Sequence, residues 1–157
     1  MPEPDFFELL KALENDKVEY VVIGGIALLI NGGAVLTADI DLCIAFEREN
    51  LNHLAAVLNQ FQPRLRNGTP VLLDEHAFGG EFVTYFTSVG VIQIINRIHG
   101  YAHFQQLAED SQVMTLKGVP IHVASLRALE KMKTGTGRAR DQLHLDIIKS
   151  LRTIRGD

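Results

Sequence analysis

"VVIGGIALLINGGAVLTADIDLCI", residues 21–44, is the stretch that decides the fold. It opens as a buried strand, reaches two adjacent glycines, and later enters a second apolar strand that carries Asp39 and Asp41. Burying one carboxylate without a partner is costly, and a second carboxylate nearby raises that cost. The pair of aspartates therefore needs a physical reason.

Alternation along a strand places the two aspartates on one side of this segment, together with Thr37 and Cys43. The other side is aliphatic and can pack into a core; it carries Ala38, Ile40, Leu42 and Ile44. Residues two apart on a strand lie about 6.6 Å from each other, so both carboxylates can converge on one or two divalent cations. The alternative is an edge strand whose polar side faces water, because Asp-x-Asp is a short and common pattern.

The glycines Gly24 and Gly25 close one apolar strand and open a helix. Backbone amides in such a turn are unobstructed and point out of a helix start, which suits a phosphate group. The alternative is a tight turn that needs glycine for its geometry only. Each feature alone is weak, but a Gly-Gly turn, a helix and an Asp-x-Asp strand within 18 residues form a moderately specific combination.

Length and composition place limits on the class of protein. The chain has 157 residues, 46% of them hydrophobic and 22% charged, so we expect a single globular domain over residues 1–157. Cys43 is the only cysteine, which excludes an internal disulfide and fits a reducing compartment. The N-terminus shows no signal-peptide pattern, and no apolar run approaches about 20 residues. These features predict a cytoplasmic protein that makes no membrane contact.

The charge is unevenly distributed along the chain. The net charge of −4 argues against broad coating of nucleic acid, yet residues 127–157 hold eight of the fifteen Lys and Arg residues. That segment is therefore a candidate anion-binding region.

Hydrophobic periodicity predicts the other elements. We expect helices near residues 6–15, 49–61, 101–110, 126–133 and 139–154, the first with an Asp5–Glu8 capping box and the fourth capped by Ser125. Strands are expected in "EFVTYFTS", "VGVIQIIN" and a hairpin that turns at Lys117–Gly118. Residues 62–80 are rich in Pro, Gly and Asn and yield no prediction. The order of elements indicates an α+β fold, a mixed sheet with helices packed mainly on one face.

The segments "VVIGGIALLINGG" and "TADIDLCI" resemble the signature of the DNA polymerase β-like nucleotidyltransferase superfamily. The resemblance is closest to its small bacterial branch of minimal nucleotidyltransferases and AbiEii-type toxin-related proteins. It continues more loosely through residues 89–107 and 119–148, where relatives carry an acidic strand, a helix with a lysine, and an Arg-x-x-Asp segment. It covers roughly residues 18–150, and it implies a nucleotidyltransferase-like sheet.

The resemblance implies transfer of a nucleoside monophosphate from an NTP, with ATP as the first choice, to an acceptor hydroxyl. Mg²⁺ or Mn²⁺ would be held by three carboxylates, two of them Asp39 and Asp41. Residues matching the nucleotide-binding positions are Gly24, Gly25, Thr37, Lys133 and Arg138. For Lys131, Lys133 and Arg138 the alternative is a solvated helix end, where positive charge complements the helix dipole.

Two positions depart from the superfamily pattern. Val35 stands where relatives often have an arginine, and Gln93 stands where the third carboxylate is expected. A glutamine oxygen can ligate a cation or orient water, but it has no charge and cannot act as a general base. Glu81, on the preceding predicted strand, is a candidate substitute, although an exposed strand start suits it better. The catalytic set implied by the resemblance is thus Asp39, Asp41 and Gln93.

Three functions follow from these observations. The first is a metal- and NTP-dependent nucleotidyltransferase whose acceptor is a small molecule, a protein or an RNA end. The second is a degenerate nucleotidyltransferase-fold protein that binds or regulates, for example as one component of a toxin–antitoxin pair with a partner protein. Gln93 favours the second function, and the intact glycine and aspartate motifs favour the first. The third, an interaction protein that binds no nucleotide, requires the motif to be coincidental.

Overall fold

A six-stranded sheet organises the chain in the computed structural model, which describes residues 5–156. The strands are β1 (Tyr20–Ile23), β2 (Asp39–Ile44), β3 (Phe82–Thr87), β4 (Gly90–Ile95), β5 (Ser111–Leu116) and β6 (Val119–Ala124). They lie in the order β3-β4-β2-β1-β6-β5. Strand β1 runs antiparallel to β2 and parallel to β6, and β2 runs parallel to β4. The predicted α+β fold with one mixed sheet in a single domain is confirmed.

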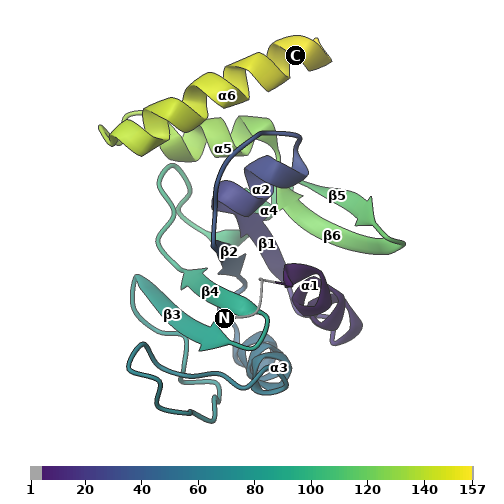
Figure 1. The fold of residues 1–157 in the computed structure, drawn as a ribbon, viewed down its shortest axis with the longest axis vertical. Helices are drawn as coiled ribbons and strands as arrows, with labels where there is room; N and C mark the ends of the chain where they lie inside the picture. Colours follow the sequence, from purple (N-terminus) through teal and green to yellow (C-terminus); the bar gives the residue numbers. More distant parts are fainter. Residues whose placement is uncertain (1–4, 157) are drawn as a thin grey trace.

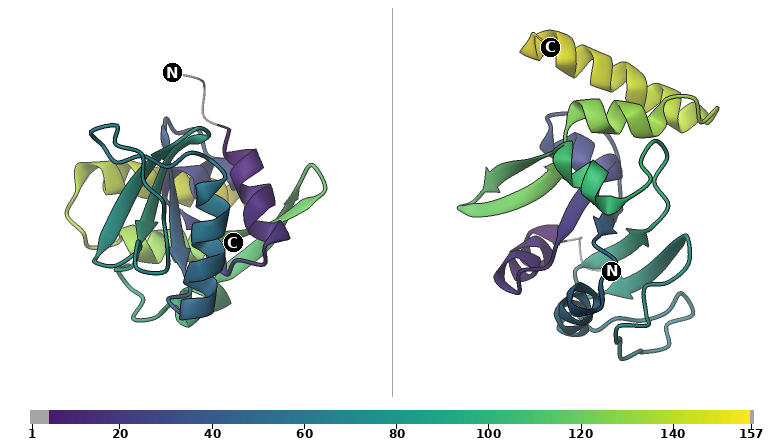
Figure 2. Two further views of the ribbon diagram at one scale, coloured as in Figure 1. Left: turned by 90° about the horizontal axis from the view of Figure 1, so that it is seen from below. Right: turned by 180° about the vertical axis from the view of Figure 1, so that it is seen from behind.

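Six helices in the described part of the chain pack around this sheet (Figure 1). They are α1 (Phe6–Asn15), α2 (Gly24–Ile30), α3 (Arg48–Asn59), α4 (Phe104–Glu109), α5 (Leu126–Lys133) and α6 (Ala139–Arg155). Helix α6 lies beside α5 at one end of the molecule, and α1 packs against α3 toward the other end (Figures 1 and 2). Helix α2 contacts β1, β2, β6 and α5, so it joins the sheet to the C-terminal helices.

Strand β2 is an interior strand, because β4 and β1 flank it on its two sides. The edge-strand alternative for the two aspartates is therefore wrong. Ile40 and Leu42 are fully buried, whereas Asp39 and Asp41 are only partly buried, so the predicted alternation of the strand is confirmed. An interior strand thus carries two carboxylates on one of its sides.

Residues 62–80, for which the sequence predicts nothing, form no helix or named strand. The segment is nevertheless fixed to the core, because Phe78 is fully buried and Leu73 is 6% exposed. The Asn59 side chain donates to the Leu73 carbonyl and accepts from its N–H, and Tyr85 donates to the Ala77 carbonyl. Tertiary contacts rather than local propensity hold this segment in place.

One local prediction is wrong and three are confirmed. Asp5 makes no capping hydrogen bond through its side chain; its backbone N–H donates instead to the Val89 carbonyl. Helix α2 begins at Gly24, so the two glycines open the helix as predicted. Ser125 does cap α5, accepting from the Ala128 N–H at 3.1 Å. The β5–β6 hairpin turns at Lys117–Gly118, both of which have positive φ as a tight hairpin requires.

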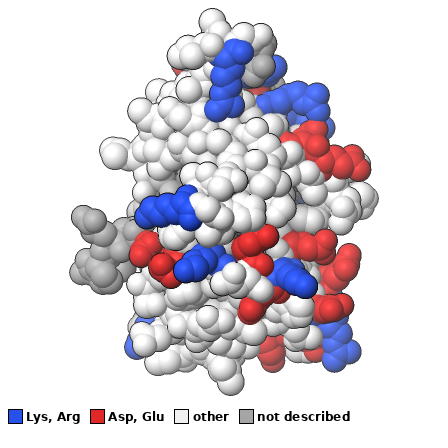
Figure 3. Space-filling model, turned by 90° about the vertical axis from the view of Figure 1, so that its right-hand side faces the viewer, with Lys and Arg blue, Asp and Glu red and all other residues white. Residues whose placement is uncertain are grey.

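Acidic and basic side chains neighbour one another on the face shown in Figure 3, and this face carries no broad basic patch. Within residues 5–156, no helix has both the length and the apolar character needed to cross a membrane.

Asn31, at the C-terminal end of α2, is 2% exposed and connects four parts of the chain. Its amide donates to the carbonyls of Ala27 and Ala124, at 2.8 and 3.2 Å. Its Oδ1 accepts from Gln112 at 2.8 Å, and Arg155 donates to its Oδ1 and to its backbone carbonyl. This buried amide therefore ties α2 to β6, to β5 and to the last turn of α6.

Substituting Asn31 with alanine is expected to lower the free energy of unfolding by about 2–3 kcal/mol, because several buried polar groups lose their partner together. Urea unfolding followed by circular dichroism measures this change. Asn52→Ala is the matched control, since Asn52 is an exposed residue of α3 and its removal should shift stability by less than about 0.5 kcal/mol. Equal stability of the two variants would contradict the connecting role of Asn31.

Candidate active site

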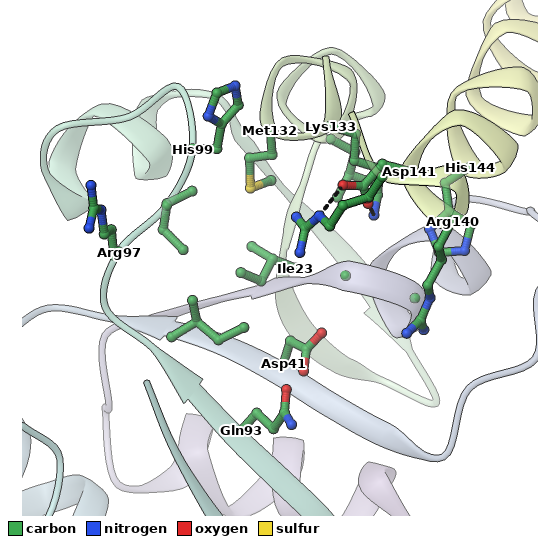
Figure 4. Close-up of a pocket in the computed structure, with 16 residues that line it drawn as sticks. Ile23, Asp41, Gln93, Arg97, His99, Met132, Lys133, Arg140, Asp141 and His144 are labelled. Atoms are coloured by element: carbon green, nitrogen blue, oxygen red, sulfur yellow. Dashed lines mark hydrogen bonds and ion pairs between the residues drawn. The ribbon is translucent and has the colours of Figure 1, made fainter. Parts of the chain in front are cut away.

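A cavity of about 270 Å³ opens where β2 and β4 face the start of α2 and the facing ends of α5 and α6 (Figure 4). We call it the central cavity. Six of the eight residues predicted from the sequence line it, namely Gly24, Gly25, Asp41, Gln93, Lys133 and Arg138. Asp39 and Thr37 are not among its lining residues. Residues more than a hundred positions apart in the sequence therefore meet at one site.

Asp41 is a poorly compensated carboxylate at the floor of the central cavity. Its Oδ1 is buried and accepts no hydrogen bond from the described residues. Burial, and to a smaller extent the negative charge of Asp39, raise its pKa to about 6 against the opposing effect of Arg140 and Lys133. A carboxylate in this state favours neutralisation, by a proton or by a bound cation.

The two glycines differ in why they are required. Gly24 has a φ of +70°, and a Cβ atom there would lie 2.2 Å from Asp41 Oδ2, so any side chain would displace the carboxylate. A Cβ atom at Gly25 would lie 3.0 Å from the Thr37 Cβ. The Thr37 hydroxyl in turn donates to the Asp39 carbonyl at 3.1 Å. The start of α2 is thus fitted closely against the segment that carries both aspartates.

The opposite wall is built around Asp141, which is 5% exposed. Lys133 Nζ lies 3.3 Å from its Oδ1, while the Thr136 hydroxyl and Arg138 Nε donate to its Oδ2 at 2.7 and 2.8 Å. Burial acts to raise the pKa of Asp141, but the Thr136 hydroxyl and the charges of Lys133 and Arg138 outweigh it and lower the pKa. The Lys133 side chain is only 13% exposed, so a solvated helix end is the wrong interpretation for this lysine.

Arg140 and His144 also line the central cavity, and the sequence-based prediction missed both. His144 is 5% exposed, and its Nδ1 has no hydrogen-bond partner among the described residues. Burial lowers its pKa, and the charges of Lys133 and Arg140 lower it further, so its imidazole is neutral at pH 7. Arg140 and His144 are four residues apart in one predicted helix, a spacing that indicates that both side chains lie on the same face of that helix.

Gln93 occupies the place next to Asp41, since the two residues are register partners in the β2–β4 pair. Glu81, the candidate substitute acid, forms an exposed ion pair with Arg97 at 2.7 Å and does not line the central cavity. No group of three or more acidic, histidine or cysteine side chains suited to a metal ion occurs among the described residues. Of the predicted ligands, the carboxylate of Asp41 and the neutral amide of Gln93 line the central cavity, whereas Asp39 does not. The uncompensated Oδ1 of Asp41 fits a cation.

An open mixed sheet with a glycine turn packed against an Asp-x-Asp strand defines a nucleotidyltransferase-like fold, and comparison with solved structures agrees. The lincosamide antibiotic adenylyltransferase LnuA, bound to lincomycin, is 15% identical, with a TM-score of 0.62 over 96% of this chain and 99% of that one. ANT(2″)-Ia in complex with adenylyl-2″-tobramycin is 12% identical, with a TM-score of 0.56 over 96% and 92%.

A candidate nucleotidyltransferase from Thermotoga maritima is 18% identical, with a TM-score of 0.56 over 96% of this chain and 88% of that one. No protein-family model matches the sequence, and no curated protein matches it. At these identities the likeness establishes the nucleotidyltransferase-like fold of the chain.

Substituting Asp41 with asparagine is expected to stabilise the protein when no metal is present. The folded-state pKa, about 6, exceeds the ordinary value of 3.8, so the ionised carboxylate costs stability above pH 6. This cost shrinks as the pH falls from about 6 toward 3.8, because the folded state then takes up the proton more readily than the unfolded state. After discounting for partial exposure, we expect a gain of about 1–2 kcal/mol near pH 8 and little gain near pH 4.

Urea unfolding in the presence of EDTA, at both pH values, measures this difference. Asp146→Asn is the control, because it removes one exposed carboxylate from α6 outside the central cavity. A loss of stability in Asp41→Asn near pH 8 would show that the carboxylate has a favourable partner in the folded protein.

Proposed function

We propose that the chain binds a nucleoside triphosphate together with Mg²⁺ or Mn²⁺ in the central cavity and transfers its nucleoside monophosphate to an acceptor hydroxyl. The observation that carries this proposal is the composition of one cavity in a nucleotidyltransferase-like fold. The glycine turn and Asp41 form one wall, and Lys133, Arg138 and Arg140 form the wall across from them. ATP is the first nucleotide to test, because LnuA is an adenylyltransferase and ANT(2″)-Ia was captured with an adenylyl product.

The cationic wall supports binding of the triphosphate. Lys133 and Arg138 share the single carboxylate of Asp141, so their combined charge is only partly neutralised. Arg140 forms no ion pair with any described residue, although it lies close enough to influence Asp41 and His144. The neutral imidazole of His144 adds a polar group without an existing partner. Phosphate oxygens would satisfy these groups together.

The carboxylate wall would hold the divalent cation. Asp39 and Asp41 supply charged oxygens, and Gln93 supplies a neutral one. When bound there, the cation neutralises phosphate charge and polarises the attacking oxygen. Gly24 keeps the Asp41 carboxylate in position, because no side chain intervenes between the start of α2 and Oδ2.

The transfer itself is a single displacement at the α-phosphorus. The acceptor hydroxyl oxygen forms a bond to the α-phosphorus, the bond from that phosphorus to the bridging oxygen breaks, and pyrophosphate leaves. The hydroxyl proton passes to water, because the amide of Gln93 is not a base. We therefore expect a slow reaction in which positioning by the two walls provides most of the catalysis.

A second candidate function is nucleotide binding without turnover, in a regulatory protein. The observation that favours it is the pairing of Gln93 with Asp41 at the position where a third carboxylate is expected. Membership of the AbiEii-type branch, a toxin–antitoxin partner and a cytoplasmic location stay predictions from the sequence. The two functions differ in turnover but share the same nucleotide site.

Calorimetric titration tests the shared site. We expect Mg-ATP or Mn-ATP to bind the wild-type protein and to bind the Asp39→Asn/Asp41→Asn variant at least about tenfold more weakly, since the metal loses both charged ligands. The matched control is Asp16→Asn/Asp146→Asn, which removes the same charge from two exposed positions. Wild-type protein that binds no NTP with either metal would refute the nucleotide site.

Restoring the third carboxylate separates the two functions. Gln93→Asp is expected to raise nucleotidyl transfer at least about tenfold over wild type, because general bases contribute rate factors of about 10²–10⁴. The assay supplies α-³²P-labelled ATP with small-metabolite, RNA or protein acceptor pools and follows labelled product and released pyrophosphate. Gln93→Glu tests whether the length of the acidic side chain affects the rate, because glutamate is one methylene group longer than aspartate. No transfer by any of the three proteins, despite Mg-ATP binding, would favour the regulatory function.

A further inference from the structure

A second cavity, of about 420 Å³, lies beside the central cavity. We call it the aromatic cavity, because the rings of Phe46, Tyr101 and Phe104 line it together with Ile98, Cys43 and Asn96. Phe46 is 55% exposed, so part of its ring is accessible from solvent. No Asp or Glu lines this cavity in the described part of the chain.

The two cavities are neighbours in the structure. Ile98 lines both of them, and the neighbouring residues Arg97 and His99 line the central cavity. Cys43 lies on β2 two residues beyond Asp41 and on the same side of that strand, hence about 6–7 Å along the strand from Asp41. The aromatic cavity therefore lies next to the part of β2 that carries the Asp41 carboxylate.

Asn96 provides a fixed polar group in the aromatic cavity. Its Nδ2 donates to the carbonyls of Phe78 and Gly80, at 2.7 and 2.9 Å, so both amide hydrogens are engaged. The amide orientation is thereby set, and Oδ1 accepts no hydrogen bond from the described residues. That oxygen is available to a hydroxyl or N–H group of a ligand.

The lining also defines the charge of a suitable ligand. A polyamine would find no carboxylate among the residues that line the aromatic cavity. A flat apolar ring finds aromatic partners in Phe46 and Phe104, whereas the Tyr101 ring is already in contact with Lys131, whose Nζ lies 4.3 Å from the ring centroid. The lining therefore selects an uncharged ring with a hydrogen-bonding substituent.

We propose that the aromatic cavity is the acceptor site, and that the acceptor is an uncharged small molecule with an aromatic or similarly flat apolar ring and a hydroxyl group. This assignment rests on the proposed nucleotidyl transfer. The ring packs among the aromatic side chains, Asn96 Oδ1 orients the molecule, and the hydroxyl faces Asp41 and the α-phosphate.

An NMR titration with 4-hydroxybenzyl alcohol as the probe tests the assignment. We expect amide shifts centred on Phe46, Ile98 and Tyr101 in wild-type protein, and at least about threefold weaker binding in Phe46→Ser, because one ring of the cavity is lost. Phe82→Ser is the matched control: Phe82 is 64% exposed, lies on β3 and does not line the aromatic cavity. Ala102→Trp, which fills the aromatic cavity from an exposed position, is a second blocking variant should Phe46→Ser fold poorly.

Spermine serves as the cationic probe and is expected not to shift these amides. Absence of shifts with the aromatic probe, or equal binding by Phe46→Ser and wild type, overturns the acceptor site. Titration of Mg-ATP into the same samples shows whether only the acceptor-site proposal fails or whether the proposed nucleotide binding fails as well. Binding of Mg-ATP without the probe refutes the acceptor site alone, and binding of the probe without Mg-ATP refutes both the proposed function and the role of the cavity in transfer.

Discussion

The carboxylate of Asp41 is the constraint on which the rest of the structure depends. It lies on an interior strand, its Oδ1 has no partner among the described residues, and burial together with Asp39 raises its pKa to about 6. The strand tolerates it because Ile40 and Leu42, on the other side, are fully buried and anchor β2 in the core. Gly24 leaves space for it. The protein thereby keeps a locally unfavourable charge where a ligand can neutralise it, an arrangement typical of functional sites.

The charges of the site are held in two separate groups, and the fold keeps them apart. Asp39 and Asp41 belong to the sheet, whereas Lys133, Arg138 and Arg140 belong to the end of α5 and the start of α6. Asp141 forms ion pairs with Lys133 and Arg138, which holds these two side chains away from Asp41. The gap between a carboxylate wall and a cationic wall suits a metal-bound polyphosphate, whose cation and anion need opposite partners.

Much of the fold could be predicted from the sequence, because β1 is a continuous apolar run, β4 alternates, and helices such as α1 carry an apolar face. The conformation of residues 62–80 could not be predicted, because tertiary contacts of buried side chains such as Phe78 determine it. The predicted Asp5 cap is absent: the side chain makes no capping hydrogen bond, and the backbone N–H of Asp5 donates to the Val89 carbonyl, a contact that the local sequence does not reveal. At the site, motif residues such as Gly24 and Asp41 were predictable. Arg140 and His144 were missed, because their role depends on how α6 docks against a distant part of the chain.

The Asn31–Arg155 contact has a consequence for folding. These residues are 124 positions apart, and the central cavity needs both the early glycine turn and the last helix. Such long-range closure is entropically costly and forms late, so the site should be among the last features to appear during folding. A nucleotide could then not guide the nascent chain and would bind only after α6 docks. Its effect would be to slow the undocking of that helix.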